Sequence, residues 1–272
     1  MATIRQGSSD ATQIPDTKKR ESVPHLLERF HCSALATDYD GTLATHGTVD
    51  EATRSAMRRF RDSGRKVILV TGRRLVELAE VYPHFDDFDA IVAENGALLY
   101  WPKDQREELL AEPPPAEFVQ LLVNADVRPL ELGKVIVATM EPYHNVVLEA
   151  IRTLGLELHV IFNKGSVMIL PSGINKATGL KRTLKVLGIP REQVAGVGDA
   201  ENDHTLLDFC GLSAAVANAL PALKERANIV LGGRHGEGVT ELMELFLGHT
   251  SVSLPEDNPA TVETRAIETP RL

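Results

Sequence analysis

The sequence has few cysteines, no long apolar run and fewer basic than acidic residues. Its 272 residues contain two cysteines and no CxxC pair, so neither a disulfide framework nor a zinc site is indicated, which fits a reducing cytoplasm. No apolar run approaches the roughly 20 residues that span a bilayer, and the N-terminus lacks the apolar core of a signal peptide. The net charge of −9 argues against non-specific nucleic-acid binding, which needs a basic face. We therefore expect a cytoplasmic protein that binds neither membranes nor nucleic acid.

Both ends of the chain also lack core-forming residues. Residues 1–22 are polar and charged, and residues 249–272 are rich in proline, threonine and glutamate. Segments of this kind bury too little apolar surface to offset the entropy lost on folding. We expect a flexible arm at residues 1–22 and a flexible tail at residues 249–272.

Between these ends, continuous Val/Ile/Leu runs alternate with helical patterns. The first runs are "SALATDY", "KVILVTG" and "AIVAENG", with helical patterns between them, and the alternation resumes towards the end of the chain. This order predicts a parallel sheet covered by helices on both faces. The fold class is therefore α/β, with a Rossmann-like core formed by residues 23–97 and 171–248.

The middle of the chain, residues 98–170, has a different pattern. It contains the proline-rich loop "AEPPPAE", a helical stretch, and two strand-like runs separated by Asn163, Lys164 and Gly165. A tight turn that contains glycine between two such runs is typical of a β-hairpin. We expect residues 98–170 to form a smaller α/β cap domain inserted into the core.

Polar residues occur where the predicted strands end. Asp38 and Asp40 follow the first strand, Thr71 the second and Asp199 a later one, and Lys176 opens the helix after the insert. Open parallel sheets bind ligands outside the carboxyl ends of their strands. These residues are therefore expected to meet at one edge of the sheet.

Phosphoryl transfer is a reaction that such a set of residues can perform. Because carboxylates repel a phosphate dianion, a divalent cation is needed, and hard oxygen ligands suit Mg²⁺. One aspartate can then attack phosphorus while the second transfers the proton. Thr71 and Lys176 can hold the phosphoryl oxygens, on which charge develops.

Each short motif has a plainer interpretation when taken alone. The run "DYDG" is also typical of a turn, and a lysine that opens a helix is most often a solvated residue. A calcium loop of the EF-hand type does not fit, because Leu43 and Val49 stand where a glycine and a glutamate are required. The functional interpretation depends on the four motifs occurring together and in order.

Taken together, "DYDGT", "VTGR", the lysine in "ILPSGINKATGL" and "GVGDAENDHTLL" resemble the four motifs of the haloacid dehalogenase-like hydrolase superfamily. "AENGALLY" and the position of the insert are similar to its Cof-type branch. The resemblance implies that Asp38 is the nucleophile and a metal ligand, and that Asp40 is the general acid/base and also binds the metal through its carbonyl. It implies phosphate binding by Thr71 and Lys176. It also implies metal binding by Asp199 and by Asp203, with Asp203 either a direct ligand or a support of the site.

Further residues near these motifs are expected to contact the substrate. They are Gly72, Arg73, Asn95, Asn163, Lys164 and Asn202. The leading hypothesis is a Mg²⁺-dependent phosphatase that hydrolyses a small phosphorylated metabolite, a sugar phosphate or a phosphoglycolate-like acid, through an aspartyl-phosphate. A phosphomutase and a non-catalytic module that senses a phosphorylated ligand are the alternatives. The sequence leaves the oligomeric state open.

Overall fold

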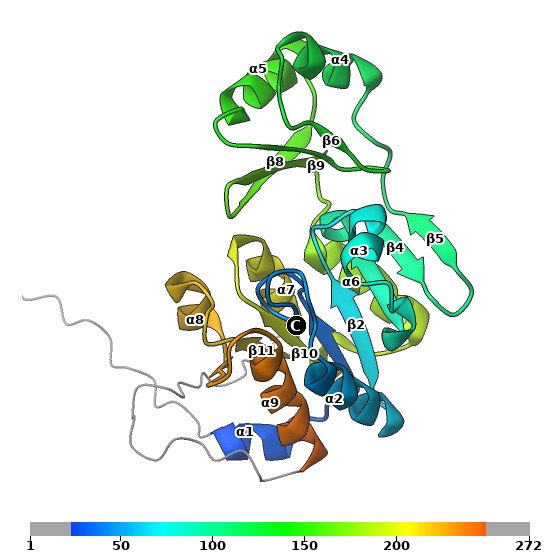
Figure 1. The fold of residues 1–272 in the computed structure, drawn as a ribbon, viewed down its shortest axis with the longest axis vertical. Helices are drawn as coiled ribbons and strands as arrows, with labels where there is room; N and C mark the ends of the chain where they lie inside the picture. Colours follow the sequence, from blue (N-terminus) through cyan, green and yellow to red (C-terminus); the bar gives the residue numbers. More distant parts are fainter. Residues whose placement is uncertain (1–22, 249–272) are drawn as a thin grey trace, which may run out of the picture.

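The computed structural model describes residues 23–248 of the chain. The predicted arm (1–22) and tail (249–272) lie outside the described residues. Within residues 23–248 there are two sheets, a large one and a small one, placed one above the other (Figure 1). No helix in this part of the chain is long and apolar enough to cross a membrane.

The large sheet has eight strands, and its centre is parallel. Strand β1 pairs in parallel with β10 on one side and with β2 on the other. The order across the sheet is β12 (Ile229–Val230), β11 (Leu212–Ala215), β10 (Val194–Gly198), β1 (Ala34–Thr37), β2 (Lys66–Val70), β3 (Ala90–Ala93), β4 (Leu98–Trp101) and β5 (Arg106–Leu109). This topology confirms the predicted α/β class and the Rossmann-like core.

Alternate residues of each strand belong to two different apolar clusters, because successive side chains of a strand point to opposite faces of the sheet. In β2, Val67 and Leu69 belong to one cluster, and Ile68 and Val70 to the other. The first cluster packs under α1 (Val23–Arg29), α2 (Glu51–Asp62), α3 (Leu75–Val81), α8 (Pro221–Arg226) and α9 (His235–Leu247). The second packs under α6 (Lys176–Leu187) and α7 (His204–Phe209). Burial on both faces explains why the strands read as continuous apolar runs.

The small sheet is antiparallel. Its order is β6 (Glu131–Leu132), β7 (Val137–Met140), β9 (Ser166–Pro171) and β8 (Leu158–Asn163). The predicted hairpin is present: Asn163 pairs with Ser166, and the two-residue loop Lys164-Gly165 has positive φ at both positions. Two positive φ angles are typical of the tight turn that matches strand twist.

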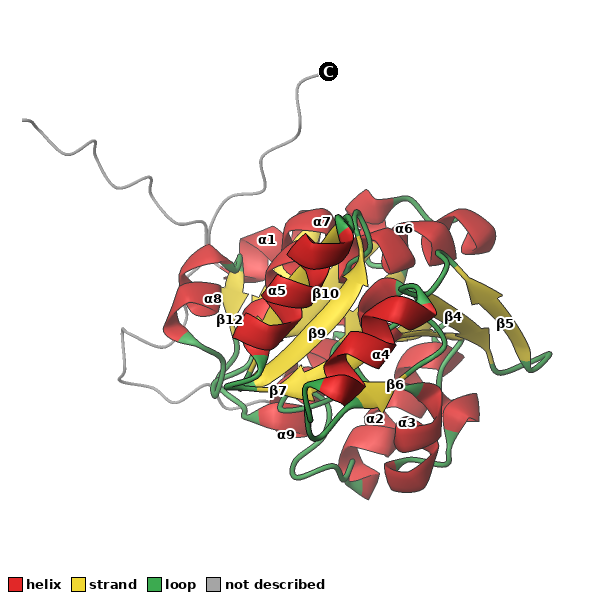
Figure 2. Cartoon of the chain, turned by 90° about the horizontal axis from the view of Figure 1, so that it is seen from above, coloured by secondary structure: helices red, strands yellow, loops and turns green. Residues whose placement is uncertain are grey.

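Helices α4 (Ala116–Asn124) and α5 (His144–Leu154) cover one face of the small sheet (Figure 2). Val137, Val167 and Ile169 of the strands pack against them. The opposite face carries Ala138 and Met168, which line a cavity towards the large sheet. The small sheet therefore presents its uncovered face to the strand ends of the large sheet.

The segment 98–109 differs from the prediction that the inserted cap begins at residue 98. Its two strands, β4 and β5, extend the large sheet antiparallel from β3. Leu98, Leu99 and Trp101 are buried in the clusters of the large sheet. Because an apolar run such as "ALLYW" suits a strand of either sheet, its sequence pattern does not show which one it joins. The inserted part that lies over the large sheet follows β5.

Candidate active site

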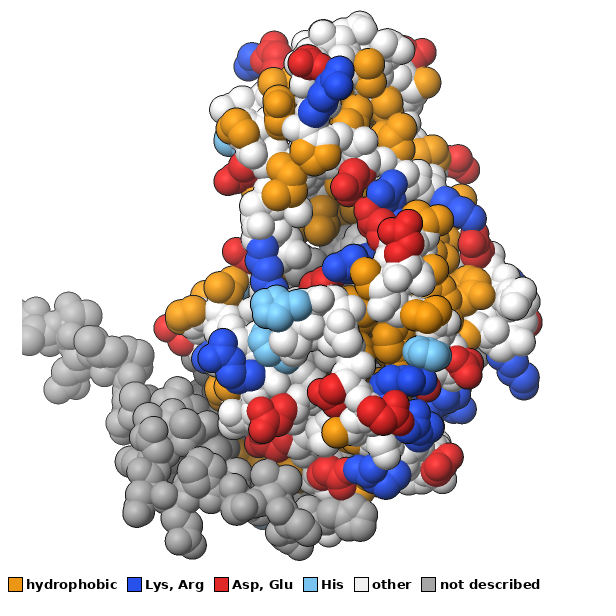
Figure 3. All heavy atoms as spheres, viewed as in Figure 1, with side chains coloured by type: hydrophobic (Ala, Val, Ile, Leu, Met, Phe, Trp, Pro, Cys, Tyr) orange, Lys and Arg blue, Asp and Glu red, His pale blue; other side chains and the backbone are white. Residues whose placement is uncertain are grey.

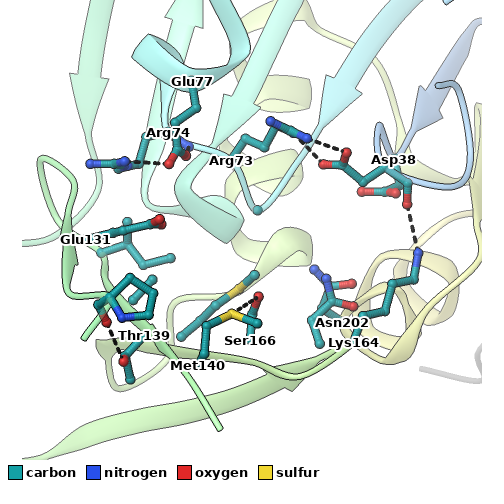
Figure 4. Close-up of a pocket in the computed structure, with 17 residues that line it drawn as sticks. Asp38, Arg73, Arg74, Glu77, Glu131, Thr139, Met140, Lys164, Ser166 and Asn202 are labelled. Atoms are coloured by element: carbon teal, nitrogen blue, oxygen red, sulfur yellow. Dashed lines mark hydrogen bonds and ion pairs between the residues drawn. The ribbon is translucent and has the colours of Figure 1, made fainter. Parts of the chain in front are cut away.

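A cavity of about 330 Å³ lies between the two sheets. The space-filling view shows it as a hollow with basic and acidic side chains around it (Figure 3). Asp38 and Arg73 enter it from loops that follow β1 and β2, whereas Met140 and Lys164 enter it from the small sheet (Figure 4). The carboxyl ends of the parallel strands thus form one wall, as expected for an open parallel sheet.

Asp38 lies at the centre of a buried charge cluster. Its main chain continues the pairing of β1, with the amide donating to the carbonyl of Val197 at 3.0 Å. Lys176 Nζ lies 2.5 Å from Asp38 Oδ1 and 2.6 Å from Asp203 Oδ1, and the Lys176 side chain is fully buried. Asn175 caps α6 and thereby makes Lys176 the first residue of that helix. Because the Lys176 ammonium has no contact with solvent, its charge is balanced by these two carboxylates.

The pKa values of this cluster are displaced by burial and by the neighbouring charges. Burial, together with the negative charges of Asp203 and Asp199, raises the pKa of Asp38 to about 7, although Lys176 acts in the opposite direction. Burial alone lowers the pKa of Lys176, but the two carboxylates outweigh it and raise that pKa above its ordinary value. Burial also raises the pKa of Asp199. The cluster contains more negative charge than one lysine neutralises.

A second cation approaches the cluster from the tip of the β8–β9 hairpin. Lys164 Nζ donates to Asp199 Oδ2 at 2.7 Å and to the carbonyl of Asp40 at 3.0 Å. Gly41 makes this approach possible, because a Cβ there would lie 2.4 Å from Asp199 Oδ2 and 2.6 Å from Lys164 Nζ, and its φ is +88°. The position between the Asp199 carboxylate and the Asp40 carbonyl therefore attracts a positive charge.

Asp40 is held by an arginine that follows β2. Arg73 donates to both carboxylate oxygens of Asp40, at 2.6 and 2.8 Å, and both residues line the cavity. Two parallel hydrogen bonds of this kind fix orientation as well as charge. The Asp40 side chain is 39% exposed, so this carboxylate remains accessible from the cavity.

The other predicted residues fall into two groups. Gly72, Asn163, Lys164 and Asn202 line the cavity together with Arg73. Thr71 and Asn95 do not line it. Thr71 is fully buried and its hydroxyl accepts the Arg73 amide hydrogen at 3.1 Å, whereas Asn95 accepts a hydrogen bond from Asn202 at 3.2 Å.

Both carboxylate oxygens of Asp203 accept hydrogen bonds from other groups of the protein. Oδ2 accepts the amide hydrogens of Asp199 and Ala200, at 2.9 and 3.0 Å, while Oδ1 contacts Lys176. Its side chain is fully buried. Asp203 therefore holds the Asp199 loop and Lys176 in place through both of its oxygens.

Several polar residues that support the site have no motif that would reveal them. Thr42 donates to Asp199 at 3.1 Å. Asn218 Nδ2 and His235 Nδ1 both donate to the carbonyl of Gly41, at 2.7 and 2.9 Å. Asn218 lies in the loop after β11 and His235 is the first residue of α9, so only the folded chain shows that they fix the glycine beside Asp40.

The acid cluster fits a hard divalent cation. One carboxylate oxygen from each of Asp38, Asp199 and Asp203 lies within 4.8 Å of the others, and carboxylate and carbonyl oxygens suit such ions. The ammonium of Lys164, between Asp199 and the Asp40 carbonyl, shows that a cation is favoured there. Because both oxygens of Asp203 already accept hydrogen bonds from the chain, the oxygens of Asp38, Asp199 and Asp40 are the better candidates for ligands.

The sequence and the fold can both be compared with known proteins. Residues 35–127 and 131–243 match the profile of a family described as haloacid dehalogenase-like hydrolases. A phosphoglycolate phosphatase of Methanothermobacter thermautotrophicus is 31% identical, covering 79% of this chain and 99% of that protein. The 5-amino-6-(5-phospho-D-ribitylamino)uracil phosphatase of Bacillus subtilis is 26% identical, covering 78% and 96%. The crystal structure of a HAD/COF-like hydrolase from Plasmodium vivax has the same fold, with a TM-score of 0.71, 21% identity and coverage of 84% and 99%.

Proposed function

The chain belongs to the haloacid dehalogenase-like hydrolases, and from this premise we propose a Mg²⁺-dependent phosphatase that works through an aspartyl-phosphate on Asp38. It acts on a small phosphorylated metabolite, as the relatives named phosphatases do. The single observation that carries the proposal is the setting of Asp38. This carboxylate reaches the cavity from a buried cluster that contains Lys176, with Asp40 two residues away.

The metal site is proposed to consist of Asp38, Asp199 and the carbonyl of Asp40. Mg²⁺ at these oxygens supplies positive charge that offsets the repulsion between the carboxylates and a phosphate dianion. Oxygen-only donors favour Mg²⁺ over softer metals. With Mg²⁺ held by these oxygens, the Lys164 ammonium that now contacts two of them would be available to the phosphoryl group or to the rest of the substrate.

In the proposed reaction one Asp38 oxygen attacks phosphorus, and the bond from phosphorus to the leaving oxygen breaks. Asp40 gives a proton to that oxygen, so the product leaves as an alcohol. The carboxylate that remains on Asp40 is held by the two Arg73 hydrogen bonds. Asp40 then takes a proton from water as the water attacks phosphorus, which breaks the bond to Asp38 and releases phosphate.

Phosphate binding is proposed for Lys176, Thr71 and the loop around Gly72. Lys176 Nζ is already 2.5 Å from Asp38, so it stays close to a phosphoryl group attached to that aspartate. The Thr71 hydroxyl accepts the Arg73 amide hydrogen and retains its own hydrogen for donation. These donors counter the charge that develops on the phosphoryl oxygens.

The substrate is proposed to be a sugar phosphate or a phosphoglycolate-like acid. A cavity of about 330 Å³ accommodates a metabolite of that size rather than a polymer. One wall is apolar, with Ile136, Met140 and Met168 from the small sheet, and Asn163 and Thr139 supply polar groups there. The phosphoglycolate phosphatase of Methanothermobacter thermautotrophicus supports the second of these classes.

A panel of phosphorylated metabolites tests the function. Release of free phosphate is measured for sugar phosphates, phosphoglycolate and nucleotides, each with and without Mg²⁺. Metal-dependent release from at least one small ester is the expected result. An isomerised phosphate ester without free phosphate would instead indicate a phosphomutase, and ligand binding without turnover would indicate a sensing module.

Replacing Asp40 with asparagine is expected to lower kcat by about 10²–10⁴-fold, because the proton donor for the leaving oxygen is lost. KM should change little, since Arg73, Lys164 and the cavity walls remain. The exposed Asp62 provides the matched control as Asp62→Asn. A kcat that falls less than about fivefold in the Asp40 variant contradicts its role in proton transfer.

Metal affinity is expected to rise with pH through neutrality. The pKa of Asp38 is raised to about 7, so this carboxyl is protonated below that pH, and a metal needs the ionised form. Below pH 7 the affinity should fall by about tenfold per pH unit, because one proton competes with the metal. Calorimetric titration with Mg²⁺ measures this slope. An affinity that is flat between about pH 6 and pH 8 would contradict a ligand role for Asp38.

The cellular setting also belongs to the proposal. A cytoplasmic location is supported by Cys32 and Cys210, which are both free. The net charge of −9 disfavours binding to nucleic acid. The proposed partner is therefore the small substrate itself.

A further inference from the structure

Glu94 has an unusual environment for an acidic residue. It follows β3 directly, is 1% exposed, and has a φ of +50°. A buried carboxylate needs hydrogen-bond donors to replace its lost hydration. Glu94 lies in the "AENGALLY" stretch, outside the four motifs to which catalytic, phosphate-binding and metal-binding roles are assigned.

The donors come from the turn between β6 and β7 of the small sheet. Glu94 Oε1 accepts the Lys134 amide hydrogen at 2.8 Å, and Oε2 accepts those of Val135 and Ile136, at 2.8 and 2.9 Å. Three successive amides directed at one anion form a concave binding site made by the main chain. Gly133 permits the approach, because a Cβ there would lie 2.7 Å from the Glu94 carboxylate.

The main chain of the same segment holds the loop that follows β2. The amide of Glu94 donates to the carbonyl of Arg73 at 3.0 Å, and the amide of Asn95 donates to the carbonyl of Thr71 at 2.9 Å. Arg73 in turn holds both oxygens of Asp40. The main chain of Glu94 is therefore hydrogen-bonded to the loop that orients Asp40, the proposed acid/base.

The side chain of Glu94 holds one wall of the cavity in place. Ile136, one of the three residues bound by the carboxylate, lines the cavity together with Ala138 of β7. Val135 and Ile136 are buried in an apolar cluster that also contains Met168. A shift of the β6–β7 turn would therefore move the wall that faces Asp38 and Asp40.

We propose that Glu94 is a positioning residue that sets the small sheet at a fixed distance from the Thr71–Arg73 loop. This distance places the substrate against Asp40 in the geometry that proton transfer needs. This inference rests on the proposed phosphatase function. The Glu94 carboxylate binds the β6–β7 turn, which forms one wall of the cavity. The main chain of Glu94 binds the loop that follows β2. A displacement of about 1 Å in such an arrangement can change a rate by about a hundredfold.

Glu94→Gln tests the proposal with a side chain of the same size. The amide places an NH₂ group against at least one of the three amide hydrogens, so one hydrogen bond becomes a contact between donors. The matched control is Glu107→Gln. Glu107 pairs with the Lys134 ammonium from β5, so this control removes a carboxylate that reaches the same turn but leaves the three amides untouched.

Hydrogen exchange of the full chain gives a readout that does not depend on activity. In Glu94→Gln the amides of residues 134–136, and those of Glu94 and Asn95, should exchange at least about tenfold faster than in wild type. The amides of β1 and β10 should keep their wild-type rates. Glu107→Gln should resemble wild type throughout. Unchanged exchange at 134–136, or an equal rise across the whole large sheet, overturns the positioning role.

Kinetics provide the second readout. With the metabolite that turns over best, Glu94→Gln should lose about tenfold or more in kcat, with KM changed less than about threefold. Loss in KM alone, or an equal loss in Glu107→Gln, overturns the proposal. If wild type hydrolyses nothing on the panel, the phosphatase function fails while the exchange experiment still decides the role of Glu94.

Gly133→Ala keeps the proposal testable if Glu94→Gln does not fold. Its added methyl group would lie 2.7 Å from the Glu94 carboxylate and 2.6 Å from Ile136 Cγ2, so it disturbs this contact while the main-chain hydrogen bonds of Glu94 remain. The expected result is faster exchange at 134–136 together with a lower kcat. Wild-type exchange and wild-type kcat in this variant count against the proposal.

Discussion

Replacing Asp38 with asparagine is expected to lower kcat for phosphate release by at least about a thousandfold, because the variant has no carboxylate to attack phosphorus. An amide at this position cannot form the acyl-phosphate on which the proposed route depends. The remaining residues of the cluster, Lys176 and Asp203, keep their mutual contact at 2.6 Å. The loss should therefore be chemical rather than structural.

The stability of that variant separates chemistry from folding. Burial and the charges of Asp203 and Asp199 raise the pKa of Asp38, so its negative charge is unfavourable in the folded protein. Removing this charge should leave the free energy of unfolding unchanged or raise it. An Asp38→Asn protein that is folded and retains wild-type phosphate release would contradict the mechanism. Asp38→Glu, which keeps a carboxylate but displaces it, should retain metal binding.

Replacing Lys176 with methionine is expected to lower the free energy of unfolding by about 3–5 kcal/mol, because two buried carboxylates lose their shared cation. Lys176 and Asp203 have no exposed side-chain surface, and Asp38 has 7%. Water therefore cannot replace the missing ammonium. Urea denaturation of the metal-free protein measures the change.

The surface pair formed by Lys66 and Asp89 provides the control for this experiment. The Lys66 side chain is 45% exposed, so Lys66→Met should change the free energy of unfolding by less than about 1 kcal/mol. Mg²⁺ should partly restore the stability of Lys176→Met, since a cation bound to the folded state alone stabilises it. Equal losses in the two methionine variants would show that the buried cluster does not depend on Lys176.

The location of the acid cluster follows from a general property of parallel sheets. Asp38, Thr71 and Asp199 each follow an apolar run, and the carboxyl ends of parallel strands lie at one edge. The structure brings Asp38 and Asp199 together with Lys176 in this way. The roles of these residues stay predictions until the variants are measured.

Contacts between the two sheets could not be predicted in the same way. Lys164 reaches Asp199 across the cavity, and this depends on the orientation of a hairpin whose sequence specifies only its own turn. Glu94 likewise has no periodic signal, because its partners are main-chain amides of residues 134–136. Any residue other than proline at those positions offers the same donor.

The place of residues 98–109 in the large sheet could not be predicted for a similar reason, and the expectation that they begin the cap was wrong. The pairing of Leu98 and Tyr100 with β3 depends on the tight turn at Glu94–Gly96, where Asn95 has a φ of +54°. Asparagine adopts this conformation more readily than most residues, but an isolated "ENG" does not show in which direction the chain returns. The direction of this turn, rather than the apolar run itself, places β4 beside β3 in the large sheet.

Trapping of the phosphorylated enzyme tests the central claim most directly. The protein is mixed with Mg²⁺ and the metabolite that turns over best on the panel, and the reaction is stopped with acid within one turnover. Peptide mass spectrometry then locates any added phosphoryl group. The proposed mechanism predicts one phosphoryl group on Asp38 in wild type and none in Asp38→Asn. Phosphate release without a phosphoryl group on Asp38, or with one on another residue, would contradict it.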